Sequence, residues 1–427
     1  MYYSEMTKEQ LLNEKELLEK EYDSYKALGL NLDMSRGKPG VEQLDLSNGL
    51  LDVLNSDSDC KSETGIDCRN YGLMDGIPDI KPLFAGMLQV KPEMIMVGGN
   101  SSLNMMFDTV AAFMYKSPVE GEKPWQEVKD RKFLCPVPGY DRHFSITEYF
   151  GFEMITIPMT ESGPDMDMIE NLVANDDSIK GIWCVPKYSN PQGITYSDET
   201  VKRFAALKPK AKDFRIFWDD AYCIHDVSDN PDTLLSLMSE CEKTGNVDLP
   251  ILFSSTSKIT FPGSGVAAMA ASESNMKMLK TKYNFQTISY DKLNMLRHAK
   301  FFGDFAGLKA HMEKHKEVLK PKFKEVITQL EEKVKDTGVA KWNNPNGGYF
   351  VTVDVMEGTA KAVVALCKEA GVVLTGAGAT YPLGKDPKDS NIRIAPTLPP
   401  VSELRSAMNI FCVATKLAAV NKLLEKA

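Results

Sequence analysis

The sequence predicts an α/β fold, with a large domain built on a mainly parallel, mixed sheet and a smaller α+β domain after it. Through the middle of the chain, short apolar runs alternate with longer amphipathic stretches, which is typical of βαβ units. Beyond about residue 300 a long charged helix, a strand and further helices replace this alternation. A chain of 427 residues, 43% of them hydrophobic, is large enough to bury cores of this size.

The first predicted element is a helix that follows Thr7 and ends near Gly29. Thr7 and Gln10 form a capping box, and Leu11 and Leu18 follow at helical spacing. We expect a surface or arm helix. The predicted strands of the large sheet are residues 94–97, 132–135, 154–158, 181–186, 215–218, 251–254 and 266–271.

The last part of the chain predicts a separate, smaller domain. Its elements are a charged helix over 309–335, a strand in GGYFVTVDV, a helix near 360–370 and a final helix from Ser402. We therefore expect three parts. They are residues 1–45 as an N-terminal arm with part of the small domain, 46–300 as the large domain and 301–427 as the small C-terminal domain.

Composition limits the partners. The net charge of -9, with no long run of Lys or Arg, argues against nucleic acid and against an anionic membrane. The eight cysteines form no C-x-x-C pair and indicate a reducing, cytoplasmic location. The charged N-terminus does not look like an export signal, and no segment reaches about 18 uninterrupted apolar residues, so we expect no membrane span.

Small and polar residues follow several predicted strands, where open α/β sheets bind ligands. The sequence GGNSSL at 98–103 places Asn100, Ser101 and Ser102 at the start of a helix, a place that suits a phosphate. Tyr140 follows the next strand, and Asn190 lies in the turn YSNPQG. The alternatives are that Tyr140 only fills the core and that Asn190 only shapes a turn.

Two further strand ends carry charged side chains. Asp219 directly follows a β-rich run in IFWDDAY, and Tyr222 comes three positions later. Asp219 either meets a cationic group or caps the next helix. Lys258 ends the run ILFSSTSK, where it is either a surface lysine or a buried amine of lowered pKa that suits Schiff-base chemistry.

Taken in order, these segments resemble the fold-type I aminotransferases that use pyridoxal 5'-phosphate (PLP). The similarity extends from SRGKPG at 35–40 to NIRIAPTLPP at 391–400. SSTSKITFPGSGVAA and PGYDRHF resemble the bacterial aspartate aminotransferase subgroup Ic, the MocR-like aminotransferases. The resemblance implies the fold of PLP-dependent transferases of type I, with residues 46–300 as the PLP-binding domain.

The resemblance also implies a role for each residue at the cofactor ring. Lys258 would form the Schiff base and move the proton of the substrate Cα. Asp219 would keep the pyridine nitrogen protonated, which makes the ring an electron sink. Tyr222 and Asn190 would hydrogen-bond the phenolic oxygen, and Tyr140 would stack on the ring. His143 would contact Asp219 without touching the cofactor itself and would hold the carboxylate in place.

The same resemblance implies a phosphate site shared between two subunits. Its residues would be Asn100, Ser101, Ser102, Ser255 and, from the neighbouring subunit of a homodimer, Tyr71. One position departs from the pattern of many members, which place an arginine eight residues after the lysine, because Val266 stands there. Either Lys38 or Lys187 would supply the missing charge, and the sequence does not decide between them.

The resemblance also implies that the substrate α-carboxylate meets Arg393, whose planar guanidinium can bind it with two hydrogen bonds, and that Gly37 closes over it. A dicarboxylic substrate needs a second cation, for which the resemblance favours Arg297, reaching into the partner's site. Arg36 and Arg142 compete with it, and for each of the three a surface or interface salt bridge is the simpler explanation.

The function expected from the resemblance is transfer of the amino group of an amino acid, such as aspartate, to a 2-oxo acid, such as 2-oxoglutarate. The alternatives are a PLP-dependent lyase or decarboxylase, or a non-catalytic effector-binding module. His311 and His315 have a spacing that can bind zinc, but the surrounding residues do not fit a metalloprotease motif, and we expect no metal.

Overall fold

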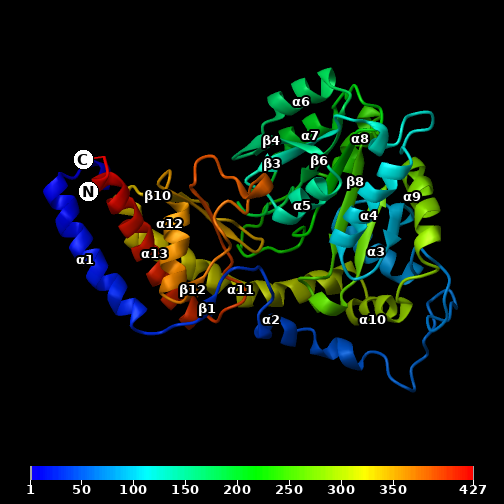
Figure 1. The fold of residues 1–427 in the computed structure, drawn as a ribbon. Helices are drawn as coiled ribbons and strands as arrows, with labels where there is room; N and C mark the ends of the chain where they lie inside the picture. Colours follow the sequence, from blue (N-terminus) through cyan, green and yellow to red (C-terminus); the bar gives the residue numbers. More distant parts are fainter. Residues whose placement is uncertain (1, 427) are drawn as a thin grey trace.

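The computed structural model describes residues 2–426 and confirms the predicted α/β fold. Its main feature is an eight-stranded sheet (Figure 1). In spatial order the strands are β2 (Ile95–Val97), β9 (Ala267–Ala271), β8 (Pro250–Ser255), β7 (Arg215–Asp219), β6 (Ile179–Cys184), β3 (Lys132–Val137), β4 (Glu153–Thr160) and β5 (Gly163–Pro164). All seven apolar runs of the sequence analysis lie on these strands.

The sheet is mixed in the way that the sequence predicts. Strands β8, β7, β6, β3 and β4 run parallel to one another, whereas β9 is antiparallel to both of its neighbours and β5 is antiparallel to β4. The carboxyl ends of the parallel strands therefore share one edge of the sheet. In such sheets this edge is where a ligand binds.

Helices cover both faces of the sheet, as its apolar strands require. Along β7, Ile216 and Trp218 enter one core cluster, and Phe217 enters the cluster on the other face. The first face is covered by α3 (Lys81–Leu88), α6 (Met166–Asn175), α7 (Asp198–Ala205), α8 (Leu237–Thr244) and α10 (Lys292–Phe302). The second is covered by α4 (Ser102–Tyr115), α5 (Asp141–Tyr149) and α9 (Glu273–Gln286).

A third core cluster belongs to the smaller α+β part of the chain. It is built on α1 (Lys8–Lys26), α12 (Ala360–Glu369), α13 (Val401–Leu424) and a three-stranded antiparallel sheet of β10 (Ala340–Trp342), β11 (Val351–Val355) and β13 (Asn391–Ile394). A small parallel pair, β1 (Leu32–Asp33) with β12 (Val372–Val373), joins the N-terminal segment to it. The capping box of Thr7 and Gln10 is present at the start of α1.

Two helices have special positions. Helix α11 (Phe305–Lys333) contributes Leu308 and Met312 to the first cluster of the large sheet and Leu319 and Phe323 to the smaller core, so it connects both parts. Helix α13 has the length and apolar composition of a membrane span, yet 67% of its most apolar window is buried inside the protein. It is therefore accounted for as the central helix of the smaller core.

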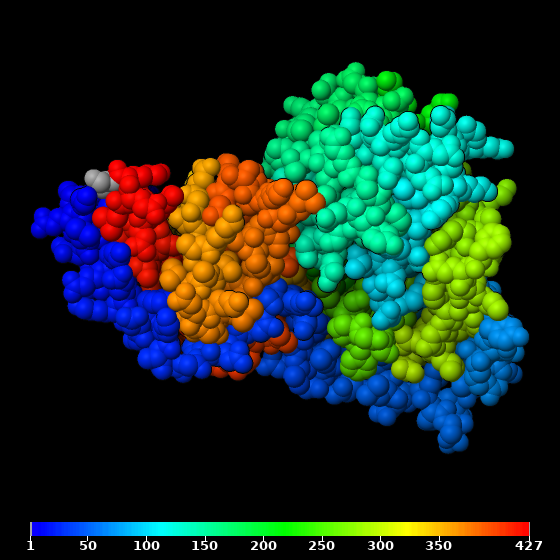
Figure 2. Space-filling model, viewed as in Figure 1, coloured from blue at the N-terminus to red at the C-terminus, as the bar shows by residue number. Residues whose placement is uncertain are grey.

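The N-terminal segment runs along one side of the molecule (Figure 2). It passes from α1 at the smaller core, through the short α2 (Val41–Asp45), to the side of the large sheet. The division of the chain into three parts at residues 45 and 300 remains a proposal.

Short 3₁₀ helices connect several of these elements. They are η1 (Tyr3–Glu5), η2 (Asn48–Asp52), η3 (Pro78–Ile80), η4 (Pro92–Met94), η5 (Trp125–Glu127), η6 (Pro262–Ser264), η7 (Lys335–Thr337) and η8 (Pro382–Gly384).

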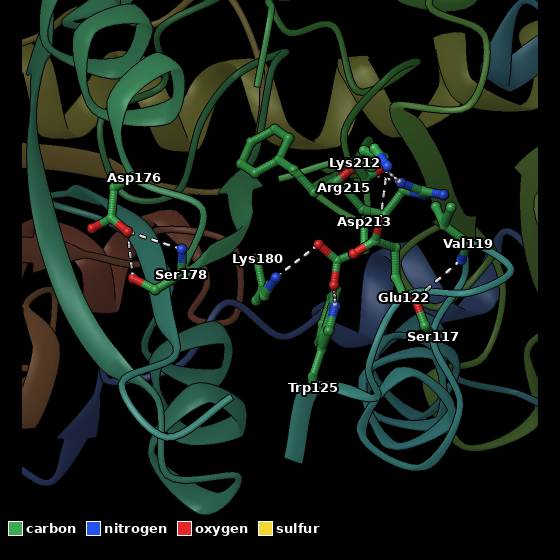
Figure 3. A network of polar contacts seen from close by, with 11 residues as sticks. Ser117, Val119, Glu122, Trp125, Asp176, Ser178, Lys180, Lys212, Asp213 and Arg215 are labelled. Carbon is green, nitrogen blue, oxygen red and sulfur yellow. Dashed lines mark hydrogen bonds and ion pairs between the residues drawn. The ribbon is translucent and has the colours of Figure 1, made fainter. Parts of the chain in front are cut away.

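At the amino ends of the strands, a buried polar network connects β6 to β7 (Figure 3). Lys180 Nζ donates a hydrogen bond of 2.8 Å to Asp213 Oδ1, and Trp125 Nε1 donates one of 2.9 Å to Oδ2 of the same carboxylate. Arg215 Nε donates to Asn275 Oδ1 at 3.0 Å. Both carboxylate oxygens of Asp213 are thus paired, as a buried charge requires.

Candidate active site

A cavity of about 590 Å³ lies at the carboxyl edge of the sheet, between the large sheet and the smaller core. The ends of β6, β7 and β8, the loop after β3, the start of α4 and residues 35–38 all contribute to its walls. The sequence assigned a role to ten of its lining residues: Gly37, Ser101, Ser102, Tyr140, Asn190, Asp219, Tyr222, Ser255, Lys258 and Arg393. Arg36, Lys38 and Arg142, which the sequence offered as alternatives, line it as well. Asn100, Tyr71 and Arg297 do not line it.

Lys258 is a half-buried residue whose amine lies near two aromatic rings. Its Nζ lies 5.1 Å from the ring centre of Tyr222 and 5.8 Å from that of Tyr349. Burial lowers the pKa of Lys258, Asp219 opposes this shift and Arg393 adds to it. An amine with a lowered pKa keeps more of its neutral, nucleophilic form near neutral pH.

Asp219 ends β7 with only one of its two oxygens paired. His143 Nε2 lies 3.0 Å from Asp219 Oδ2, and the imidazole in turn stacks on Trp183 with ring centres 4.5 Å apart. Asp219 Oδ1 is buried without a hydrogen-bond partner. Because an unpaired buried carboxylate oxygen is costly, this atom fits a ligand that brings an N–H group. The structure thus places His143 against Asp219, as the resemblance implied.

Two tyrosines complete the inner wall. Tyr222 is stacked on Tyr349 with ring centres 5.9 Å apart, and Tyr140 packs edge-on against His143 at 5.0 Å. Burial raises the pKa of Tyr140 to about 12, and Asp219 adds to the shift. Burial also raises the pKa of Tyr222 well above 10. Both phenols therefore stay protonated at neutral pH and can act as hydrogen-bond donors.

Arg393 is a buried guanidinium that is only partly paired within the chain. Its Nη1 donates to Asn190 Oδ1 at 3.1 Å and to Asp141 Oδ1 at 3.3 Å, and its plane lies 4.7 Å from the ring of Phe350. Arg393 Nε is buried with no partner. The free N–H fits a carboxylate in the cavity, and the bond to Asn190 Oδ1 leaves the amide NH₂ of Asn190 for another acceptor.

Four serine hydroxyls surround the start of α4. Ser101 is the N-cap residue of this 14-residue helix and Ser102 its first residue, while Ser255 and Ser257 come from the end of β8. Ser255 Oγ donates to Ser257 Oγ at 3.0 Å. The hydroxyls and the free backbone N–H groups of the helix suit an anion. The side chain of Asn100 instead donates to Gly263 O at 3.4 Å, outside the cavity lining.

The structure distinguishes the two lysines proposed to replace an arginine at Val266. Val266 is a buried residue beside the lysine loop, with its backbone N–H donating to Thr256 Oγ1 at 2.9 Å. Lys187 Nζ bonds Asp226 Oδ1 at 3.0 Å and Cys223 O at 2.9 Å, away from the cavity. Lys38 lines the cavity and is exposed. Of the two lysines, only Lys38 contacts the site.

Three other predicted residues have clear positions. Gly37 packs so closely on Phe350 that a Cβ would lie 2.6 Å from its ring, so the loop over the cavity needs glycine there. Tyr71 is 77% exposed, and Arg297 is half-buried on α10 with an unpartnered Nε. In one chain, neither Tyr71 nor Arg297 lines the cavity.

His311 and His315 are buried and hydrogen-bonded to each other, with their Nε2 atoms 3.1 Å apart. Within residues 2–426, no group of three or more His, Cys, Asp or Glu side chains is arranged to hold a metal ion. The histidine pair therefore belongs to a protein hydrogen-bond network.

Several lining residues were missed by the sequence analysis. Ser257 lies one position before the predicted lysine, and Asp141 directly follows the predicted Tyr140, so proximity to those residues was an available signal. Phe350 and Thr375 come from the smaller part of the chain, far from the other residues in sequence. No local pattern marks them.

An amine of lowered pKa, a half-paired carboxylate and a half-paired guanidinium that share one cavity define a group-transfer enzyme built around a lysine. A family model described as aspartate amino-transferase matches residues 6–427, so the chain belongs to this family and is an aminotransferase. It is 45% identical over 402 residues to an aspartate aminotransferase of Corynebacterium glutamicum, covering 94% of this chain and 93% of that protein.

Solved structures agree with this assignment. The crystal structure of an aspartate transaminase from Corynebacterium glutamicum superposes with a TM-score of 0.96 at 43% identity, covering 99% of each chain. The α-aminoadipate aminotransferase of Thermus thermophilus, complexed with N-(5'-phosphopyridoxyl)-L-leucine, has a TM-score of 0.73 at 18% identity and covers 93% of each chain. The second similarity shows the shared fold alone.

Proposed function

We propose that this aminotransferase uses PLP to move the amino group of aspartate to 2-oxoglutarate, and that it belongs to subgroup Ic. The observation that supports the cofactor best is that Asp219 Oδ1 and Arg393 Nε are buried without a partner, on two side chains that line one cavity with Lys258. A ring N–H would pair the first atom and a carboxylate the second. When bound, PLP supplies an aldehyde and an electron-withdrawing ring.

Each residue of the site would then have a separate role toward the cofactor or the substrate. Lys258 would hold the cofactor and carry the proton that leaves the substrate Cα, a task that suits an amine of lowered pKa. Asp219, oriented by His143, would keep the ring nitrogen protonated. Tyr222 and the amide NH₂ of Asn190 would donate to the phenolic oxygen, and Tyr140 would cover the ring.

The main experiment is a spectrum of the purified protein. We expect a visible absorption band that shifts when aspartate is added and returns with 2-oxoglutarate, with keto acid formed only when an acceptor is present. Lys258→Ala should abolish the adduct that borohydride fixes to the wild type and should lower kcat by at least about 10³-fold. A borohydride-fixed adduct that persists in Lys258→Ala would refute the lysine assignment.

We propose that the phosphate is held by Ser101, Ser102, Ser255 and Ser257 at the start of α4, with Lys38 supplying charge. The neighbouring helix dipole favours an anion there. The Lys38→Met variant should bind PLP more weakly while its affinity for pyridoxal, which lacks the phosphate, stays unchanged. Equal weakening for both compounds would show that Lys38 acts elsewhere. The side chain of Asn100 is turned away, so only its backbone remains in this proposal.

We propose that the enzyme is a cytoplasmic homodimer whose sites are shared, with Tyr71 reaching the partner's phosphate. Support comes from exposed apolar side chains in one region. Phe285, in the last turn of α9, is 91% exposed, and Ile288, just after the helix, is 65% exposed. The segment of Tyr71 is bonded to α10 through Lys292 Nζ and Gly72 O at 2.8 Å. Such exposure is typical of a surface that is covered in an assembly.

The shared site can be tested by mixing two damaged subunits. A Lys258→Ala chain and a Tyr71→Ala chain should each be impaired alone. In a mixed dimer one site carries both changes and the other carries neither, so mixing should restore activity. If activity never exceeds the sum of the two parents, each chain forms its own site.

We propose that a distal carboxylate meets the cationic rim of the cavity, where Arg36 and Arg142 are both exposed and line the wall. Arg297, which does not line this cavity, can contribute only to the partner's site. The Arg36→Met, Arg142→Met and Arg297→Met variants should be compared by kcat/KM for aspartate and for alanine. The residue that binds the distal carboxylate is the one whose loss lowers the aspartate value by about 10²-fold and leaves alanine unaffected.

A further inference from the structure

A buried hydrogen-bond network contacts the backbone of the lysine loop. Tyr349 OH donates to the backbone carbonyl of Lys258 at 3.3 Å. Gln43 Nε2 donates to Tyr349 OH at 2.8 Å and contacts His315 Nδ1 at 3.1 Å. Because His315 Nδ1 accepts from Gln43, the hydrogen of this imidazole lies on Nε2, which donates to His311 Nε2 at 3.1 Å. Ser47 Oγ, which lies 3.3 Å from His311 Nε2, donates to the backbone carbonyl of Ile259 at 3.3 Å. Two successive carbonyls of the lysine loop are therefore contacted by one network.

The members of the network come from distant parts of the chain. Gln43 lies on α2, and Tyr349 lies two residues before β11. Both histidines lie on α11, which connects the two cores. Gln43, His315 and Tyr349 have almost no solvent exposure. A buried polar group is costly unless it is satisfied, so such a network is stable only in a specific arrangement of these elements.

The network is also joined to the loop that covers the cavity. Gln43 Oε1 accepts from Gly40 N at 3.3 Å, at the end of the loop 35–40. The loop touches the network a second time at Gly37, where a Cβ would lie 2.6 Å from Phe350 and 3.4 Å from Tyr349. The ring of Tyr349 in turn stacks on Tyr222 and lies near Lys258 Nζ. The covering loop and the lysine loop thus share one set of contacts.

We propose that Gln43, His311, His315 and Tyr349 are positioning residues, which hold the backbone of Lys258 and Ile259 in register with the loop that covers the cavity. This inference rests on the proposed role of Lys258. None of the four has a place in the cofactor or substrate contacts proposed above.

The histidine pair serves this purpose in its neutral form. With two Nε2 atoms 3.1 Å apart, one must donate the single hydrogen between them and the other must accept it. Burial lowers the pKa of His315 to about 3, with His311 adding to the shift, and burial also lowers the pKa of His311. The two neutral imidazoles therefore hold the loop in place through hydrogen bonds and do not donate a proton to the reaction.

The test uses Tyr349→Phe, which keeps the ring and removes one hydroxyl, together with Gln43→Leu and the double variant. The control is Tyr22→Phe, which removes a tyrosine hydroxyl that donates to a backbone carbonyl, Leu366 O at 2.8 Å, within the smaller core. Two properties are measured: amide hydrogen exchange of residues 254–262 in the cofactor-free protein, and the pH titration of the visible band in the holoenzyme.

We expect each single variant to speed exchange in residues 254–262 by about 3- to 10-fold and to shift the titration midpoint of the band, with kcat reduced more than KM changes. The double variant should add little to the larger single effect, because both changes interrupt the same network. Tyr22→Phe should leave both properties unchanged.

The proposal is overturned if Tyr349→Phe and Gln43→Leu leave exchange and titration as in Tyr22→Phe, or if their effects add fully. Failure of the proposed function gives a different result. In that case the wild-type band is absent, or Lys258→Ala retains the adduct, whereas hydrogen exchange in the cofactor-free protein still reports on the network itself.

Discussion

The two ends of strand β7 carry buried aspartates in opposite states. Asp213, just before the strand, has both oxygens paired, by Lys180 and by Trp125 (Figure 3). Asp219, the last residue of the strand, has His143 on one oxygen and nothing on the other. Two aspartates about six residues apart therefore differ: at one edge of the sheet both carboxylate oxygens are paired, and at the other edge only one is.

This difference distinguishes a buried charge that stabilises the fold from a buried charge that serves the function. A fully paired buried carboxylate can be explained by the stability of the fold alone. An orphaned carboxylate oxygen on a residue that also lines a cavity, as in Asp219, indicates a ligand. Arg393 supports the same conclusion, because its Nε is also buried without a partner and the residue lines the cavity with Asp219. The two edges of the sheet should therefore respond differently to matched substitutions.

The largest effect is expected for Asp219→Asn. We expect kcat/KM to fall by about 10²- to 10⁴-fold, since loss of a buried charge partner costs roughly 3–5 kcal/mol. The unfolding free energy of the cofactor-free protein should change little, because the variant also removes an unpaired charge. Steady-state kinetics and urea unfolding measure the two quantities. A large loss of stability with normal kinetics would place Asp219 with Asp213 as a structural residue.

Asp213→Asn should show the reverse pattern. It leaves the buried ammonium of Lys180 without its counter-charge, so we expect a loss of about 3–5 kcal/mol in the free energy of unfolding. Urea unfolding at neutral pH measures this loss. The folded fraction should keep its kcat and KM, because Asp213 lies at the opposite edge from the cavity. A reduced kcat per folded site would contradict the separation of the two edges.

Asp220 sharpens the comparison through pH. Burial raises its pKa to about 7, Lys187 opposes the shift and Asp219 adds to it. The folded state therefore binds a proton more tightly than the unfolded state, so stability should fall as pH rises from about 4 to 7, by up to about 4 kcal/mol. Unfolding at pH 5 and pH 8 should show a smaller decline for Asp220→Asn than for wild type. An identical decline would mean that Asp220 is ionised throughout.

The smallest effect is expected for Trp125→Phe. The variant keeps an aromatic ring in the core but removes the N–H that donates to Asp213 Oδ2, while Lys180 keeps the charge paired. A hydrogen bond to a charged group is worth about 1.5–3 kcal/mol, so the loss in unfolding free energy should lie in this range. A loss as large as that of Asp213→Asn would show that the indole, more than Lys180, satisfies the carboxylate.

Much of the fold could be predicted because its signals are local. Each predicted strand of the large sheet is a short apolar run, and burial of both faces of a parallel sheet requires such a run. The α1 helix was marked by its capping box and the α11 helix by its charged periodicity. The antiparallel direction of β9 has no such signal, since strand direction depends on the path of the chain and not on side-chain type.

The inner residues of the site were also predictable, because residues at the carboxyl ends of parallel strands converge on one edge. Lys258, Asp219, Asn190 and Tyr140 follow this rule. Tertiary structure decided the rest. The side chain of Asn100 points away from the cavity, and Lys187 pairs with Asp226. Phe350 lines the cavity from the smaller core.

By itself, the sequence determined the α/β class, the strands, and the amine and carboxylate that line the cavity, because these depend on periodicity and on strand ends. Only the tertiary structure decided which polar atoms remain unpaired and how Gln43, Tyr349 and the two histidines meet at the lysine loop. Such pairings join residues up to about 300 positions apart, and no local pattern encodes distances between side chains of separate elements.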